Sequence, residues 1–133
     1  MDRKQVMEMF NKRPRIGTLS TANKDGEVNV AIFGSPQMTD EDTVVMGIGN
    51  NRSLSYLQQN PKAVFIVMEP GSTPMDWKGC RVYLSVDLIQ DQGEMLDSIR
   101  AKIAEAAGEA AAKMIHAAVR FKVTEVRALI AAP

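Results

Sequence analysis

Polar residues follow a run of glycines in the middle of the chain, in the segment Gly47-Ile48-Gly49-Asn50-Asn51-Arg52-Ser53. The pattern before it predicts a strand, and the pattern after it predicts a helical turn. A helix start offers free backbone N–H groups and the positive end of its dipole, and both favour an anion. Arg52 adds planar donors suited to phosphate, and Ser53 adds a hydroxyl at the predicted N-cap. The segment is a candidate phosphate site.

The segment matches neither of the common nucleotide-binding motifs. The sixth position of a dinucleotide fingerprint is taken by Arg52, and the Gly-Lys pair of a P-loop is absent. An Arg-Ser pair at a helix start is also common as an ordinary surface cap. Spacing alone therefore leaves two interpretations open, an anion site and a simple cap.

The chain has one cysteine and one histidine, Cys80 and His116. Two such residues do not make a zinc site, so no metal centre is predicted. Cys80 has no base close to it in sequence, and a buried, inert thiol is expected there. His116 is expected either to pack against neighbouring side chains or to lie at the surface. The sequence points to no catalytic acid, base or nucleophile.

Composition excludes several classes of function. The 133 residues carry 16 basic and 16 acidic side chains, a balance that is not typical of a dedicated nucleic-acid binder. No apolar run approaches the ~20 residues that cross a bilayer. The amphipathic N-terminus lacks the apolar stretch of a signal peptide. We therefore expect one cytoplasmic domain over 1–133, with no membrane and no nucleic acid as partner.

Periodicity along the chain predicts a barrel rather than alternating βαβ units. Asp2 is expected to cap a first helix, and Asn23-Lys24-Asp25-Gly26 is a strong hairpin turn. Ala63–Met68 is apolar throughout and is expected to be buried on both faces, and a change of period near Thr124 predicts a β-bulge. Strands are predicted at 16–21, 28–33, 43–48, 63–68, 80–90 and 119–126, with helices at 94–107 and 109–115. The predicted fold class is mainly β: a mostly antiparallel β-barrel with appended helices.

The order and spacing of four short motifs resemble the pyridoxamine-5'-phosphate-oxidase-like family of FMN-binding split barrels. The resemblance covers Arg15–Met68, whereas the second half of the chain matches only in layout. Val28 departs from the family's usual proline, and Arg52 stands where lysine is more common. The matching stretches are Ile16-Gly17-Thr18-Leu19-Ser20-Thr21, Asp25-Gly26-Glu27-Val28-Asn29-Val30, Arg52-Ser53 and Asn60-Pro61-Lys62-Ala63-Val64.

The resemblance implies that the chain binds flavin mononucleotide (FMN). Arg52 and Ser53, with Asn51 beside them, correspond to the phosphate ligands. The residues that would line the flavin ring are Val30, Ala31, Ile32 and Phe33 on one strand, and Met46, Gly47 and Ile48 on the strand beside it. Similar split barrels form homodimers in which both subunits line each flavin. Trp77 and Lys78 are our candidates for a contribution across that interface; alternatively, Trp77 packs on the rim of its own barrel.

The resemblance indicates a small FMN-dependent oxidoreductase, in which the flavin transfers hydride or electrons from a small-molecule donor or substrate. It does not imply that the chain oxidises pyridoxamine phosphate. Two other functions stay open: a flavin-binding electron carrier or cofactor-sequestering protein, and a differently occupied barrel acting as an assembly or sensing module. The barrel could also hold a deazaflavin or a heme in place of FMN. A lone histidine makes axial ligation of heme less favourable.

Overall fold

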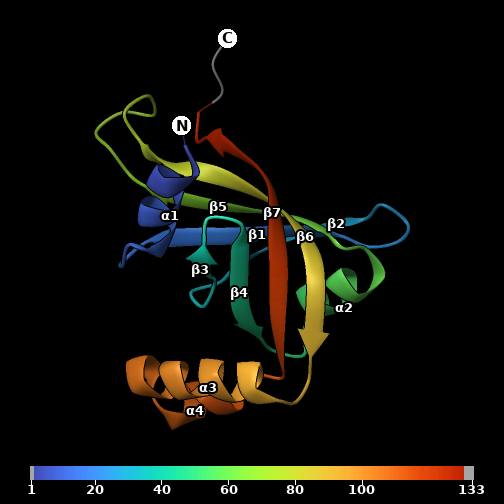
Figure 1. Cartoon of the computed structure of the whole chain (residues 1–133). Coiled ribbons are helices and arrows are strands. Elements are labelled where there is room, and N and C mark those ends of the chain that lie inside the picture. The colour runs from blue at the N-terminus through green and yellow to red at the C-terminus, as the bar shows by residue number, and fades with distance from the viewer. Residues whose placement is uncertain (1, 131–133) are drawn as a thin grey trace.

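The computed structural model describes residues 2–130 (Figure 1). The described part of the chain contains no helix long and apolar enough to span a membrane. Its helices and strands, in chain order, are α1 (Arg3–Asn11), β1 (Ile16–Ala22), β2 (Val28–Ile32), β3 (Gln37–Asp40), β4 (Thr43–Ile48), α2 (Arg52–Gln59), β5 (Lys62–Glu69), β6 (Lys78–Gln90), α3 (Glu94–Ala107), α4 (Glu109–Lys113) and β7 (Ala117–Ala128).

The strands form one seven-stranded sheet in the order β2-β1-β5-β6-β7-β4-β3. Every strand pair is antiparallel. Strands β1, β2 and β5 cross the direction of β4, and the long strands β6 and β7 bend from one half of the sheet into the other (Figure 1). The predicted fold class, an antiparallel barrel with appended helices, is confirmed.

Two irregularities between β6 and β7 accompany this bend. Tyr83 pairs with Glu125 and Leu84 pairs with Val123, so Thr124 is the extra residue of a bulge. A second shift between Val86 and Leu88 leaves Asp87 out of register, and its carboxylate meets Arg120 Nε at 2.9 Å. Bulges bend a strand and increase its twist, so both help the sheet to curl. The bulge predicted near Thr124 is confirmed.

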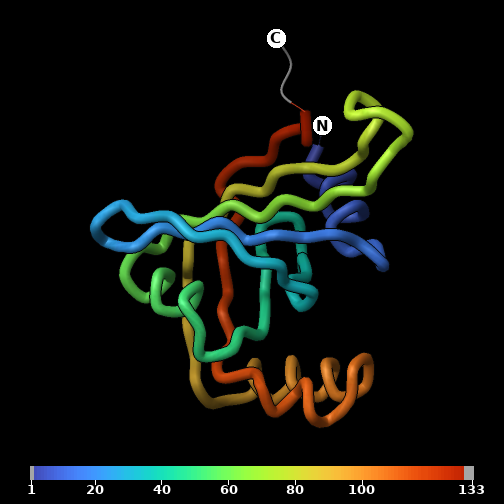
Figure 2. The backbone as a smooth tube through the Cα atoms, turned by 180° about the vertical axis from the view of Figure 1, so that it is seen from behind, coloured from blue at the N-terminus to red at the C-terminus, as the bar shows by residue number. Residues whose placement is uncertain are grey.

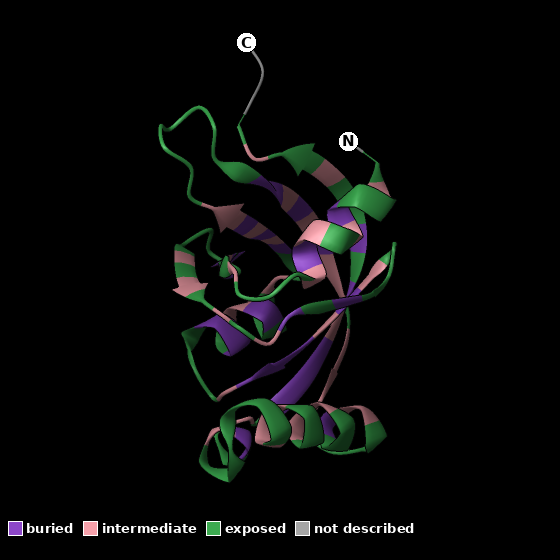
Figure 3. Cartoon of the chain, turned by 90° about the vertical axis from the view of Figure 1, so that its left-hand side faces the viewer, coloured by how far each residue is buried: buried purple, intermediate pink, exposed green. Residues whose placement is uncertain are grey.

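The core lies inside the curled sheet, and α1 covers one end of it (Figure 3). Asp2 accepts a hydrogen bond from Gln5 N at 2.8 Å, and the Gln5 side chain accepts one from Asp2 N, which completes a capping box. Val6 and Phe10 point inward and are fully buried, and the Phe10 ring lies 5.2 Å from that of Phe65 on β5. The predicted first helix is confirmed.

Strand β5 corrects one expectation. Its inward residues Ala63, Phe65 and Val67 are buried, but the alternate residues are only half-buried. The second face is therefore not covered by the chain itself. The sequence did not predict β3, because four residues, mostly polar, are too short to produce a recognisable alternation.

Candidate functional site

The predicted anion segment joins β4 to α2, as the sequence indicated. Asn51 has extended backbone geometry, and its side-chain oxygen accepts a hydrogen bond from Leu54 N at 3.0 Å. Asn51 is therefore the N-cap, and the prediction that Ser53 caps the helix is wrong. The cap satisfies one first-turn N–H, while the N–H groups of Arg52 and Ser53 have no acceptor within the helix. This helix start can still donate to an anion.

Ser53 is directed inward instead. It is 2% exposed, and its hydroxyl oxygen accepts a hydrogen bond from Asn29 Nδ2 at 3.3 Å. That bond ties β2 to the start of α2. Asn29 was not predicted as a site residue, although a polar residue between two valines of an alternating strand was an available signal.

Arg52 lies at the surface beside this pair. Within residues 2–130, its guanidinium makes no hydrogen bond or ion pair with the protein. An exposed guanidinium next to two free helix N–H groups can bind a phosphate in bidentate fashion without first breaking a protein contact. The Arg52 guanidinium and the backbone N–H of Ser53 can therefore bind the same anion. The Ser53 hydroxyl is buried and faces Asn29 instead.

Strand β2 presents its side chains alternately to two faces. Val30 and Ile32 point outward and are 62% and 75% exposed, whereas Ala31 is half-buried. Phe33 directly follows the strand, where its backbone N–H donates to Gly17 O at 3.1 Å. Of the four apolar residues predicted to line a flavin on this strand, Val30 and Ile32 are therefore accessible on its outward face, whereas Ala31 is half-buried and Phe33 packs against the core.

Strand β4 is placed differently from the expectation. It does not pair with β2, since β7 and β3 are its neighbours in the sheet. Met46 and Ile48 are 1% exposed and belong to the core. A Cβ on Gly47 would meet the side chains of Ile99 and Ile115 at 2.8 and 2.9 Å, so α3 and the chain after α4 cover this strand. Its side chains are not accessible to a ligand.

One hydrogen bond connects β4 to the end of β2. Ser35, in the loop after β2, donates from its hydroxyl to Gly47 O at 2.7 Å. Two arginines hold the same loop from the other side, since both Arg13 and Arg15 donate to Gly34 O and Pro36 O. The loop that positions the outer edge of β2 is therefore fixed to β4 and to the start of β1.

The loop between β5 and β6, which contains Trp77 and leads into Lys78, lies at the opposite end of the molecule from α2 (Figure 2). Trp77 is 36% exposed, in a loop that Asp76 shapes by accepting hydrogen bonds from the N–H groups of Ser72 and Thr73. Within one chain these two residues do not meet Arg52. Their contribution to a flavin site would require a second subunit, and that prediction stays a prediction.

The buried-thiol prediction for Cys80 is confirmed. The residue is fully buried, and burial raises the pKa of its thiol to about 11 against the opposing effect of Arg15. His116 is exposed, and its backbone N–H donates to Ile48 O at 2.8 Å. Residues 2–130 contain no group of three potential metal ligands.

We expect Cys80 to resist thiol reagents in the folded protein. The thiolate is the reactive form, and at about pH 8 a thiol with a raised pKa carries very little of it. A chromogenic disulfide reagent should leave the native protein unlabelled and should label one thiol per chain in guanidinium chloride. Rapid labelling of the native protein would show that this part of the core opens readily.

No protein-family model matches the chain, and no curated protein has a detectably similar sequence. Solved structures do match. An FMN-binding protein from Syntrophomonas wolfei superimposes with a TM-score of 0.82 at 21% identity, over 98% of this chain and 90% of the other. The fold is a split β-barrel.

Two further split barrels extend this result. A candidate pyridoxamine 5'-phosphate oxidase from Lactobacillus delbrueckii matches with a TM-score of 0.67 at 14% identity, over 93% of this chain and 91% of the other. The heme storage protein HutZ from Vibrio cholerae matches with a TM-score of 0.70 at 15% identity, over 96% and 95%. The split-barrel resemblance drawn from the motifs is thus confirmed at the level of the fold, and its structural relatives hold more than one kind of cofactor.

Proposed function

We propose that this split barrel binds FMN, with the phosphate at the start of α2 and the flavin ring against the outward face of β2. The observation that carries the proposal is the exposed Arg52 guanidinium beside two helix N–H groups without an intrahelical acceptor. The hydrogen bond from Asn29 to Ser53 joins the phosphate site to the strand proposed for the ring. A phosphate monoester therefore suits one end of the site and an apolar ring system the other.

We further propose that the chain forms a homodimer through the outer face of β1, β2 and β5. This face carries exposed or half-exposed apolar side chains on all three strands: Ile16, Val28, Val30, Ile32, Val64, Ile66 and Met68. Patches of this kind on a soluble protein are typical of association surfaces. The apolar run of β5 fits a strand covered on both sides, and a second copy would supply the missing cover.

The dimer also supports the cofactor assignment on energetic grounds. One charge-assisted hydrogen bond contributes ~1.5–3 kcal/mol, and a ligand of FMN's size can reach about 9 kcal/mol. The phosphate site alone does not supply that amount. A ring placed against Val30 and Ile32 at the edge of the face would be enclosed by the partner subunit, and Trp77 and Lys78 of that subunit remain the proposed contributors.

With FMN bound, we propose an oxidoreductase, in which the flavin carries the hydride or electrons and the protein positions it. The described residues near the site include no evident acid or base. The alternative is an electron carrier without a substrate of its own, which needs no acid or base beside the flavin.

Flavin titration and reduction test this proposal. Adding FMN to the purified protein should quench the flavin's fluorescence in proportion to the protein present, and FMN that copurifies should make the protein yellow. Bound flavin that bleaches with NADH or NADPH supports an enzyme, and flavin that bleaches only with dithionite supports the carrier. If FMN does not bind at all, both functions are excluded.

A further inference from the structure

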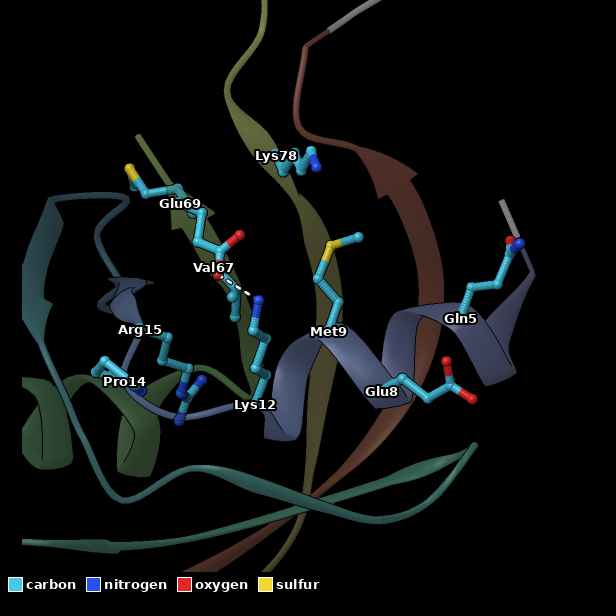
Figure 4. A pocket seen from close by; sticks show the side chains of 10 residues that line it. Gln5, Glu8, Met9, Lys12, Pro14, Arg15, Val67, Glu69 and Lys78 are labelled. Atoms are coloured by element: carbon cyan, nitrogen blue, oxygen red, sulfur yellow. Dashed lines mark hydrogen bonds and ion pairs between the residues drawn. The ribbon is translucent and has the colours of Figure 1, made fainter. Parts of the chain in front are cut away.

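A cavity of about 450 Å³ lies at the α1 end of the barrel, between α1 and the adjoining ends of β5 and β6 (Figure 4). This volume falls within the range that holds small organic molecules. The cavity lies away from the phosphate site of its own chain, because β5, with eight residues, spans roughly 25 Å from the α2 side of the molecule to the α1 side. Among its lining residues, only Lys78 and Met68 have a role in the proposed FMN dimer, and the rest of the cavity has none.

Its walls combine apolar and cationic side chains from several segments. Figure 4 shows Met9 on α1 and Val67 on β5 beside the opening, with Lys12 and Lys78 on either side of Glu69. Pro14 and Met68 complete the apolar surface, and Arg15 adds a third cation. An apolar wall with a few charged groups at its rim is typical of a site for an amphipathic small molecule.

The charges around the cavity do not balance. Lys12 Nζ lies 2.7 Å from Glu69 Oε1, so these two neutralise each other. Lys78 and Arg15 form no ion pair within residues 2–130, and Glu8 is the remaining carboxylate of the lining. One positive charge is left over, which matches a ligand with a single negative charge.

Arg15 has an unusual environment for a cation. Its guanidinium lies between the rings of Phe10 and Phe65, 4.9 and 5.0 Å from their centroids. Nη2 donates to carbonyl oxygens only, while Nε and Nη1 are buried without a hydrogen-bond partner. Burial, reinforced by the neighbouring Arg13, lowers the pKa of Arg15 to about 10. A charge this poorly compensated keeps the adjoining cavity electropositive.

We propose that this cavity binds a small organic monocarboxylate. Its carboxylate would lie between Lys12 and Lys78, and its apolar part would pack against Met9 and the adjoining surface of Val67. The carboxylate of the ligand competes with Glu69 for Lys12. Without ligand, Lys12 pairs with Glu69, and the bound carboxylate would take the place of Glu69 in this ion pair. The inference does not depend on FMN, and its test uses Lys12 and Glu69 because, unlike Lys78, they belong to no part of the proposed flavin site.

Hexanoate is a suitable probe, with hexanol as its neutral counterpart. We expect hexanoate to bind with a dissociation constant on the order of 1 mM, as befits a ligand of few atoms. In methyl NMR spectra of methionine-labelled protein, the Met9 signal should shift, whereas that of the exposed Met114 should not. Equal binding of hexanol, or shifts confined to Met114, would overturn the proposal.

Two substitutions with opposite effects sharpen this test. Lys12→Met should weaken hexanoate binding roughly three- to fivefold, and Glu69→Gln should strengthen it by a similar factor, since it frees Lys12 for the ligand. The Lys12 side chain is 63% exposed and that of Glu69 is 45% exposed, so folding should be preserved. Lys102→Met on α3 is the matched control and should change nothing. FMN titrations should be the same in all variants; effects of the same sign from Lys12→Met and Glu69→Gln would contradict a carboxylate site.

Discussion

Replacing Arg52 with alanine is expected to weaken FMN binding roughly ten- to a hundredfold while leaving riboflavin binding unchanged. The factor corresponds to one charge-assisted hydrogen-bond donor lost from the phosphate. Riboflavin carries the same ring system without the phosphate, so it reports on the ring site alone. Fluorescence titration of both ligands with wild-type and variant protein measures the difference. Arg52 is exposed and makes no described contact within the protein, so its loss should not affect folding.

Lys102→Ala provides the control for a general loss of positive charge, since this residue is exposed on α3, away from the site. It should bind both flavins as the wild type does. If Arg52→Ala weakened riboflavin and FMN equally, the guanidinium would act on the ring or on the fold. The phosphate would then bind elsewhere, and the helix start would be an ordinary cap.

The second large effect is expected from Ile32→Glu on β2. A carboxylate at position 32 would lie at the edge of the apolar face, where the partner is proposed to cover it, and would lose its hydration without gaining a partner, so the dimer should weaken by about a hundredfold or more. Light scattering should then report a mass near the 14.6 kDa of one chain instead of twice that value. FMN binding should fall as well, because Ile32 is itself a proposed contact of the ring and the partner is proposed to enclose that ring.

Ile32 is 75% exposed in the single chain, so the substitution should leave the barrel folded, as circular dichroism can check. Met114→Glu serves as the matched control, because Met114 is equally exposed but lies outside the proposed interface. That variant should remain a dimer with FMN. A wild-type protein that is monomeric at micromolar concentration, or an Ile32→Glu variant that stays dimeric, would exclude the proposed interface.

Local signals in the sequence determined most of the secondary structure. The strand Thr43–Ile48 and the helix Glu94–Ala107 were predicted with the bounds that the structure has. Both segments have patterns that end at clear boundaries. Gly108, with a φ of 94°, forms the boundary at the end of the helix. The change of period at Thr124 likewise predicted the bulge, because an extra residue shifts every later side chain of the strand to the other face of the sheet.

The sequence predicted the candidate phosphate site only in part. The sequence placed Arg52 at the start of a helix, since a strand, a glycine-rich turn and a helical pattern follow one another there. It did not identify the cap, because Asn51 and Ser53 both suit that position, and only the bond from Asn29 on another strand decided which side chain turns inward. The separation of β4 from β2 is a property of the sheet order and leaves no local trace.

Tertiary structure alone decided which apolar faces are covered. Period-two alternation separates the two faces of a strand, but it does not tell whether the second face meets water, the chain itself or another subunit. For this reason the outer face of β5 was expected to be buried and is half-exposed in the single chain. Arg15 is the converse case: its charged side chain lies between Phe10 and Phe65 because α1 folds over the end of the barrel, and no local pattern in the sequence indicates this environment.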